Sequence, residues 1–65
     1  MDVRQELSKL LGQIEEQIRE VETTAAGMNI PAYKLRDANG NFVMAPLLAA
    51  KAQTWHSLVL MNQRR

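Results

Sequence analysis

The stretch that decides the fold is LSKLLGQIEEQIREVETTAAGM, residues 7–28. Apolar residues recur in it at alternating intervals of four and three, the spacing of a helix that packs lengthwise against another helix. These apolar positions, called the seam below, are Leu7, Leu11, Ile14, Ile18, Val21, Ala25 and Met28. The pattern predicts helix-on-helix packing, and it points to no particular substrate or cofactor.

The composition is that of one small folded domain, residues 1–65. Hydrophobic residues make up 46% of the chain and charged residues 23%, which is typical of a folded domain and not of a disordered chain. The chain has no cysteine, so neither a disulfide framework nor a thiolate zinc site can stabilise it. Because a chain this short buries little surface by itself, we expect its stability to come from helix packing or oligomerisation.

Two helices are predicted, at about residues 2–26 and 46–62. Asp2 is a suitable N-cap for the first helix. Gly27 is placed directly after its last turn, where a left-handed conformation costs glycine little. Pro46 suits the first turn of the second helix.

The second helix carries more apolar surface than one short partner helix can cover. Its broad apolar side holds Leu47, Leu48, Ala52, Trp55, Leu58 and Val59. We expect Trp55 in the core, with an interface anchor as the alternative, because tryptophan is common in both settings.

Between the helices, residues 33–44 are predicted to form a short β-hairpin. Asn39-Gly40 is typical of a two-residue type I′ turn, in which both central residues need a positive φ. That turn sets a register in which Leu35 pairs with Met44, Arg36 with Val43 and Asp37 with Phe42. The predicted apolar face holds Tyr33, Leu35, Phe42 and Met44, and the opposite face holds Lys34, Arg36, Val43 and Ala45.

These elements together predict a mainly α fold of two antiparallel helices joined by a segment with a short β-hairpin. We expect a homodimer or homotetramer in which the seam meets the second helix and a partner chain, as in a four-helix bundle. The residues placed in this oligomer interface are Leu7, Leu11, Ile14, Ile18, Val21, Trp55 and Val59.

Charge is unevenly distributed along the chain, although the net charge is only +1. Residues 1–28 carry six acidic and three basic residues, a net of −3, and residues 29–65 carry five basic and one acidic, a net of +4. Two complementary packing elements explain this asymmetry. The alternative is a nucleic-acid contact through Lys34, Arg36, Arg64 and Arg65, although Tyr33 and Phe42 point away from Lys34 and Arg36 in the predicted register.

No set of residues indicates catalysis, a metal or a cofactor, so we expect a protein that is not an enzyme. His56 and Ser57 are neighbours on a helix and point about 100° apart, which prevents them from acting as a catalytic pair. The run that begins at Asp37 resembles a calcium loop only superficially, because Gly40 stands in the wrong position and a turn explains the run.

The expected function is a small protein–protein interaction module, a self-associating adaptor or regulator with an unidentified protein partner. The alternative is a small dimeric nucleic-acid-binding protein. The order helix, hairpin, helix is similar to that of small phage head-completion and other virion-assembly proteins, a similarity of architecture that suggests a phage-encoded protein. The longest apolar stretch, residues 42–50, is too short to span a membrane, and the start is not a targeting segment, so a cytoplasmic protein is expected.

Overall fold

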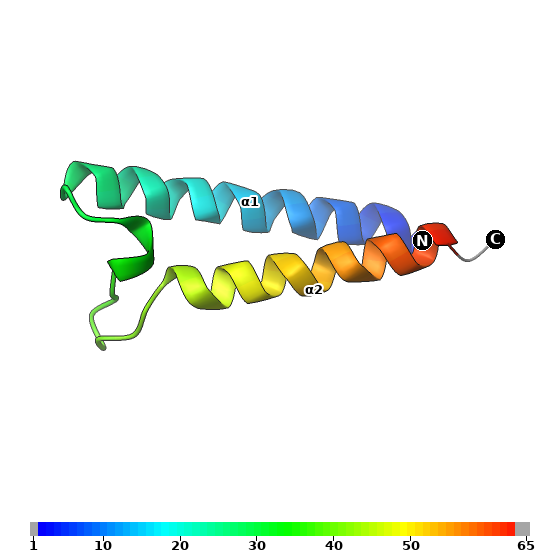
Figure 1. Cartoon of the computed structure of the whole chain (residues 1–65). Coiled ribbons are helices and arrows are strands. Elements are labelled where there is room, and N and C mark those ends of the chain that lie inside the picture. The colour runs from blue at the N-terminus through cyan, green and yellow to red at the C-terminus, as the bar shows by residue number, and fades with distance from the viewer. Residues whose placement is uncertain (1, 64–65) are drawn as a thin grey trace.

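The computed structural model describes residues 2–63, which form two long antiparallel helices joined at one end by an irregular segment (Figure 1). Helix α1 spans Val3–Gly27, helix α2 spans Met44–Gln63, and a single 3-10 turn, η1, spans Ala32–Lys34 between them. The mainly α fold with two helices is therefore confirmed. All four helix ends lie within two residues of their predicted positions.

Helix α1 begins at the predicted cap. The backbone of Asp2 is extended, with φ −97° and ψ 112°, and its Oδ1 accepts a hydrogen bond from the Arg4 N–H at 2.9 Å. The carboxylate satisfies one of the free N–H groups of the first turn and lies at the positive end of the helix dipole.

The end of α1 is a Schellman motif in which Asn29 is the left-handed residue. Asn29 has φ 61°, and its N–H donates to the Ala26 carbonyl at 3.1 Å, while the Ile30 N–H donates to the Ala25 carbonyl at 3.0 Å. Asparagine is one of the few residues besides glycine that adopt this conformation at low cost. The prediction that Gly27 holds this position is wrong by two residues.

The predicted strands of residues 33–44 are not formed. Within the described residues, this segment contains a single antiparallel bridge, between Arg36 and Phe42, and no strand. Two short strands are marginally stable by themselves, and here the second one gives way to α2, which begins already at Met44.

The turn also differs from the predicted type I′ form. The Gly40 N–H donates to the Asp37 carbonyl at 3.0 Å, and the Asp37 N–H donates to the Asn41 carbonyl at 2.9 Å. Gly40 is left-handed with φ 82°, but Asn39 is not. The connection therefore has three residues rather than two, with the left-handed glycine after the turn.

The extra turn residue shifts the pairing by one position, which reverses the faces of the side chains. Arg36 lies opposite Phe42, and the Val43 N–H donates to the Leu35 carbonyl at 3.1 Å. Leu35 and Val43 are half-buried, whereas Arg36, Phe42 and Tyr33 are exposed. The predicted apolar face is therefore wrong for Tyr33 and Phe42.

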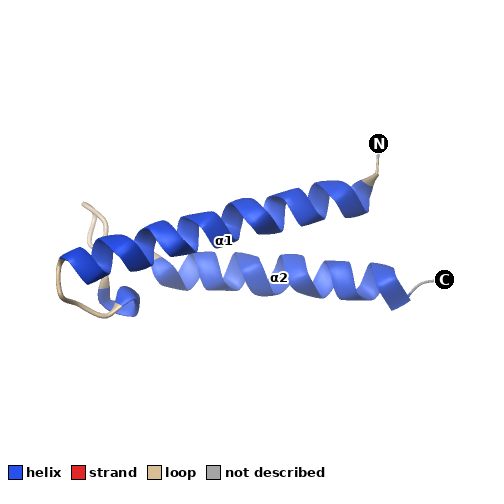
Figure 2. Cartoon of the chain, turned by 90° about the horizontal axis from the view of Figure 1, so that it is seen from above, coloured by secondary structure: helices blue, strands red, loops and turns tan. Residues whose placement is uncertain are grey.

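The core lies along the line where the two helices touch. Its members come from both helices: Ile14, Val21, Ala25, Met44, Thr54 and Leu58. The molecule is a rod of 46 × 18 × 15 Å with a radius of gyration of 14.3 Å (Figure 2). A compact domain of this length has a radius of about 11 Å, so much of each helix faces outward.

Candidate functional site

The face of α2 that packs against α1 is less apolar than the sequence suggests. We call this the inner face. Its residues follow a three-four spacing and are Met44, Leu47, Lys51, Thr54, Leu58 and Met61. All six are buried or half-buried, including a threonine and a lysine. Helix α2 is thus rotated away from the orientation that would bury its most apolar side.

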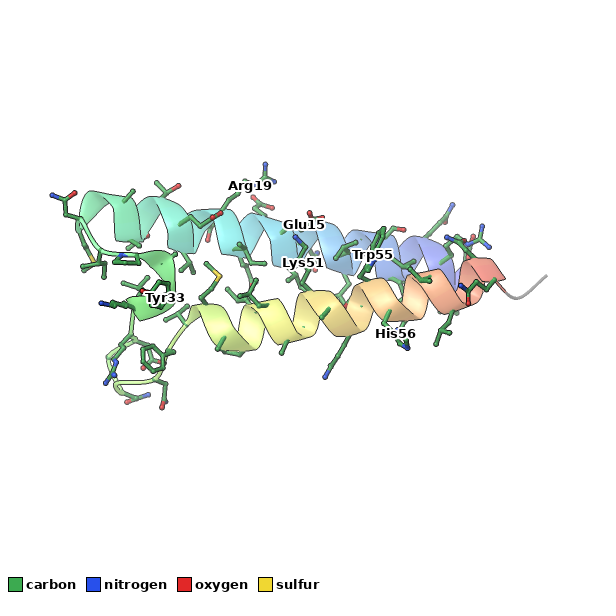
Figure 3. All side chains as sticks on the ribbon, viewed as in Figure 1. Glu15, Arg19, Tyr33, Lys51, Trp55 and His56 are labelled. Carbon is green, nitrogen blue, oxygen red and sulfur yellow. The ribbon has the colours of Figure 1, made fainter. Side chains whose placement is uncertain are left out.

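The polar residues of the inner face are accommodated locally. Thr54 is only 7% exposed, and its Oγ1 donates to the Ala50 carbonyl at 2.8 Å, so its hydroxyl is not left unsatisfied. Lys51 Nζ lies 3.8 Å from a carboxylate oxygen of Glu15, and Figure 3 shows the two side chains between the helices. Both side chains are nearly half exposed, so the pair adds little to the stability of the fold.

A second apolar line runs along α2, one residue and therefore about 100° away from the inner face. We call this line the outer stripe. Its residues have the same three-four spacing as the inner face and are Ala45, Leu48, Ala52, Trp55 and Val59. Leu48 is 51% exposed and Trp55 is 59% exposed, so neither is covered by α1. The expectation that Trp55 lies in the core of the chain is wrong, because Thr54 takes the inward position beside it.

The residues predicted for the oligomer interface fall into three groups by burial. Ile14 and Val21 are buried within one chain, Leu7, Leu11, Ile18 and Val59 are half-buried, and Trp55 is exposed. The middle of the seam therefore packs against α2 of the same chain, while Met28 at its end is 60% exposed. Trp55 is the member most available to a second chain, and assembly itself stays a prediction.

A cleft of about 590 Å3 opens where the loop meets α2. We call it the loop cleft. The residues that line it are Tyr33, Lys34, Arg36, Phe42, Met44, Ala45 and Leu48. The Arg36 guanidinium lies over the Phe42 ring at 4.4 Å, and Lys34 Nζ lies 6.0 Å from the centre of the Tyr33 ring. Both contacts are within the range of cation–π interactions.

The loop cleft groups two basic residues of the predicted nucleic-acid contact with two aromatic residues. The predicted register separates Lys34 and Arg36 from Tyr33 and Phe42, but in the structure all four line one cleft: the bridge pairs Arg36 with Phe42, and the 3-10 turn η1 carries Tyr33 and Lys34. A three-residue turn at Asp-Ala-Asn-Gly would have placed Phe42 on the same face as Lys34 and Arg36, whereas Tyr33 joins them through the 3-10 turn η1. Arg64 and Arg65, the other two predicted nucleic-acid contacts, lie outside the described residues.

The candidate catalytic residues are not brought together. His56 is exposed and lies on the side of α2 away from α1 (Figure 3). The Ser57 hydroxyl donates to the Gln53 carbonyl at 3.1 Å. Asp37 Oδ1 accepts the N–H groups of Asn39 and Asn41, at 2.9 and 3.0 Å, which explains this carboxylate as a turn residue.

Two further properties concern residues 2–63 only. Among them, no three histidine or acidic side chains are grouped closely enough to hold a metal ion. Neither α1 nor α2, over its described length, is both long and apolar enough to cross a membrane.

Comparison with known proteins adds no family to this geometry. No protein-family model matches the chain, and no curated protein or solved structure matches it significantly.

Proposed function

We propose that the protein is a non-enzymatic interaction module that self-associates through the outer stripe of α2. The observation that carries the proposal is the 59% exposure of Trp55 in the middle of a regular apolar line. A large aromatic side chain left in water loses the free energy of burial, and tryptophan is the residue type most enriched at interface anchors.

The amount of exposed surface fits such an interface. The chain exposes 5265 Å2, whereas a compact monomer of this mass exposes about 4,200 Å2. The excess of about 1,000 Å2 is similar to the roughly 800 Å2 that each partner buries in a stable complex.

The spacing of the outer stripe supports a four-helix bundle as the assembled form. Leu48, Ala52, Trp55 and Val59 follow the four-three alternation that packs one helix along another. Two helical hairpins that bury this line against each other form a homodimer with a two-fold interface. The small side chain of Ala52, between Leu48 and Trp55, leaves room for a bulky side chain of the second copy.

The test uses Trp55 as its own reporter, because it is the only tryptophan of the chain. We expect sedimentation equilibrium at micromolar concentration to show a dimer or larger species. On dilution, the emission maximum should move to longer wavelength as Trp55 returns to water. A monomer that unfolds cooperatively, with emission independent of concentration, would contradict the proposal.

A matched pair of variants locates the surface. Ala52→Glu places a charge in the outer stripe and keeps both Trp55 and the inner face, so it should produce a folded monomer. Gln53→Glu introduces the same charge at the next, exposed position and should assemble like the wild type. Equal behaviour of the two variants would remove the outer stripe from the proposal.

Nucleic-acid binding is the second candidate function, favoured by the grouping of Lys34 and Arg36 with Tyr33 and Phe42 in the loop cleft. Single-strand binders combine aromatic and basic residues in this way. Its test is binding to a random single-stranded oligonucleotide at increasing salt, because phosphate contacts weaken steeply with salt. A flat salt dependence, or no binding at low salt, would contradict it.

A further inference from the structure

We infer that the loop cleft binds an acidic peptide segment of a partner protein, with one large apolar side chain in the cleft and carboxylates on Lys34 and Arg36. The inference rests on the proposed function as an interaction module; the loop cleft shares Ala45 and Leu48 with the outer stripe, and its other five lining residues lie outside that stripe. Self-association through the outer stripe and peptide binding in the loop cleft together describe an adaptor.

The cleft offers an apolar side chain a preformed place. Met44 is 5% exposed and belongs to the core, while Phe42 is 46% and Tyr33 65% exposed. Ala45 and Leu48 complete the apolar lining from the first turns of α2. The volume of about 590 Å3 lies within the roughly 300–1,000 Å3 of small-ligand sites, so a single leucine, phenylalanine or tryptophan side chain fits.

The charge of the cleft selects for an anion. Two of its lining residues, Lys34 and Arg36, are basic, and no lining residue is acidic. The nearby carboxylate of Asp37 is held by two backbone N–H groups of the turn. The first turn of α2, which contributes Met44 and Ala45, contains no acidic residue, so its positive dipole end is not offset there.

Arg36 is also held in place before a ligand arrives. Its guanidinium is stacked over Phe42 at 4.4 Å, which limits its rotamers and still leaves its N–H groups free to bind a carboxylate at the edge. Preorganisation of this kind lowers the entropy lost on binding.

The surroundings of the cleft favour a peptide over a nucleic acid. Five of the seven lining residues are apolar or aromatic, which suits a side chain better than a phosphate backbone. A nucleic acid needs a row of cations, whereas α1 presents the exposed acidic residues Glu16, Glu20 and Glu22. A short peptide needs only the two cations at the cleft.

The experiment is a selection of bead-displayed random dodecapeptides on the immobilised full chain. We expect enrichment of peptides with a large apolar residue flanked by aspartate or glutamate. The best peptide, labelled with fluorescein, is then titrated by anisotropy in parallel with a labelled thymidine oligonucleotide of similar charge. Enrichment without acidic residues, no enrichment, or tighter binding of the oligonucleotide would overturn the inference.

Charge reversal makes the test specific to the cleft. Lys34→Glu with Arg36→Glu should weaken the acidic peptide at least tenfold and should select basic peptides instead, because the salt bridges are reversed in sign. The control, Lys9→Glu with Arg19→Glu, makes the same change of net charge at exposed sites of α1 and should keep the selection unchanged. Equal loss in both double variants would show a net-charge effect and overturn the cleft assignment.

A third variant separates this inference from the proposed function. Phe42→Ser removes one apolar wall of the cleft at a residue outside the outer stripe, so it should abolish peptide binding and leave the dimer intact. Ala52→Glu should do the reverse. Peptide binding that depends on Ala52 and not on Phe42 would place the partner on the outer stripe and overturn the inference.

Discussion

Helices α1 and α2 pack against each other along most of their lengths, but they differ in how many apolar lines they carry. Helix α1 has one, the seam, with Ile14, Val21 and Ala25 buried against α2. Helix α2 has two, and the more apolar one, which contains Trp55, is not the one that faces α1. The position of the apolar residues therefore decides which face of α1 is buried, but it does not decide which face of α2 is buried.

The difference follows from what α1 can cover. The single seam of α1 can cover only one line of residues along α2. That line is the inner face, in which Met44 and Leu58 are the buried apolar residues. Two polar residues, Lys51 and Thr54, fall on the same line. Thr54 is tolerated because its hydroxyl donates to a backbone carbonyl, and Lys51 because its half-exposed side chain lies beside Glu15. The outer stripe is then left uncovered by α1, with Leu48 and Trp55 exposed.

The largest effect is expected from a charge in the shared core. Ile14, which is 7% exposed, should not tolerate Ile14→Asp, because a buried unpaired carboxylate costs about 3 kcal/mol or more. We expect loss of helical circular dichroism over the whole chain, since neither helix is stable without the other. The neighbouring exposed change Gln13→Asp should leave the fold intact. A folded Ile14→Asp protein would show that the two helices do not depend on each other.

A pair of truncations on α2 tests the two lines directly. Leu58, 8% exposed on the inner face, should lose about 2–4 kcal/mol of stability as Leu58→Ala because a cavity remains. Trp55→Ala should leave the stability of the dilute monomer nearly unchanged and reduce self-association instead. Urea unfolding at a protein concentration below the dissociation constant of the dimer measures the stability of the monomer, and sedimentation measures self-association. If Trp55→Ala were the more destabilising change in the monomer, Trp55 and not Leu58 would face α1.

The turn that joins the two helices is expected to contribute less than either core residue. Asp37→Ala removes the acceptor of two backbone N–H groups at an exposed site and should cost about 1 kcal/mol. Asp37→Asn keeps an oxygen at that position and should recover most of the loss, as thermal unfolding can show. Equal destabilisation by both variants would mean that the charge, rather than the hydrogen bonds, holds the turn.

The smallest effects separate the regular helix from the loop. Gly12 lies inside α1 with open space around its Cβ position, so Gly12→Ala should stabilise the chain by about 0.5–1 kcal/mol. Gly40 has equally open space but φ 82°, so Gly40→Ala should destabilise it by about 1 kcal/mol. Melting temperatures of the two variants should shift in opposite directions. A shift of the same sign in both would contradict the left-handed conformation of Gly40.

The residues of the candidate site show where sequence reasoning fails in this chain. The sequence places Trp55 inside and separates Arg36 from Phe42, and the structure reverses both placements. Each error is a change of one residue: α2 buries Thr54 instead of Trp55, and the turn has one more residue than predicted. In a helix or a strand, one residue is enough to move a side chain to another face.

The sequence by itself determined the number of helices, their approximate ends, the cap at Asp2 and the inward face of α1, because these depend on local propensity and on a single unambiguous period. Only the tertiary structure decided which of the two apolar lines of α2 faces α1, and which side chains share the loop cleft. Both choices depend on the relative rotation and connection of elements far apart in the sequence. Where a helix has two apolar faces, only contact with its neighbour selects one of them.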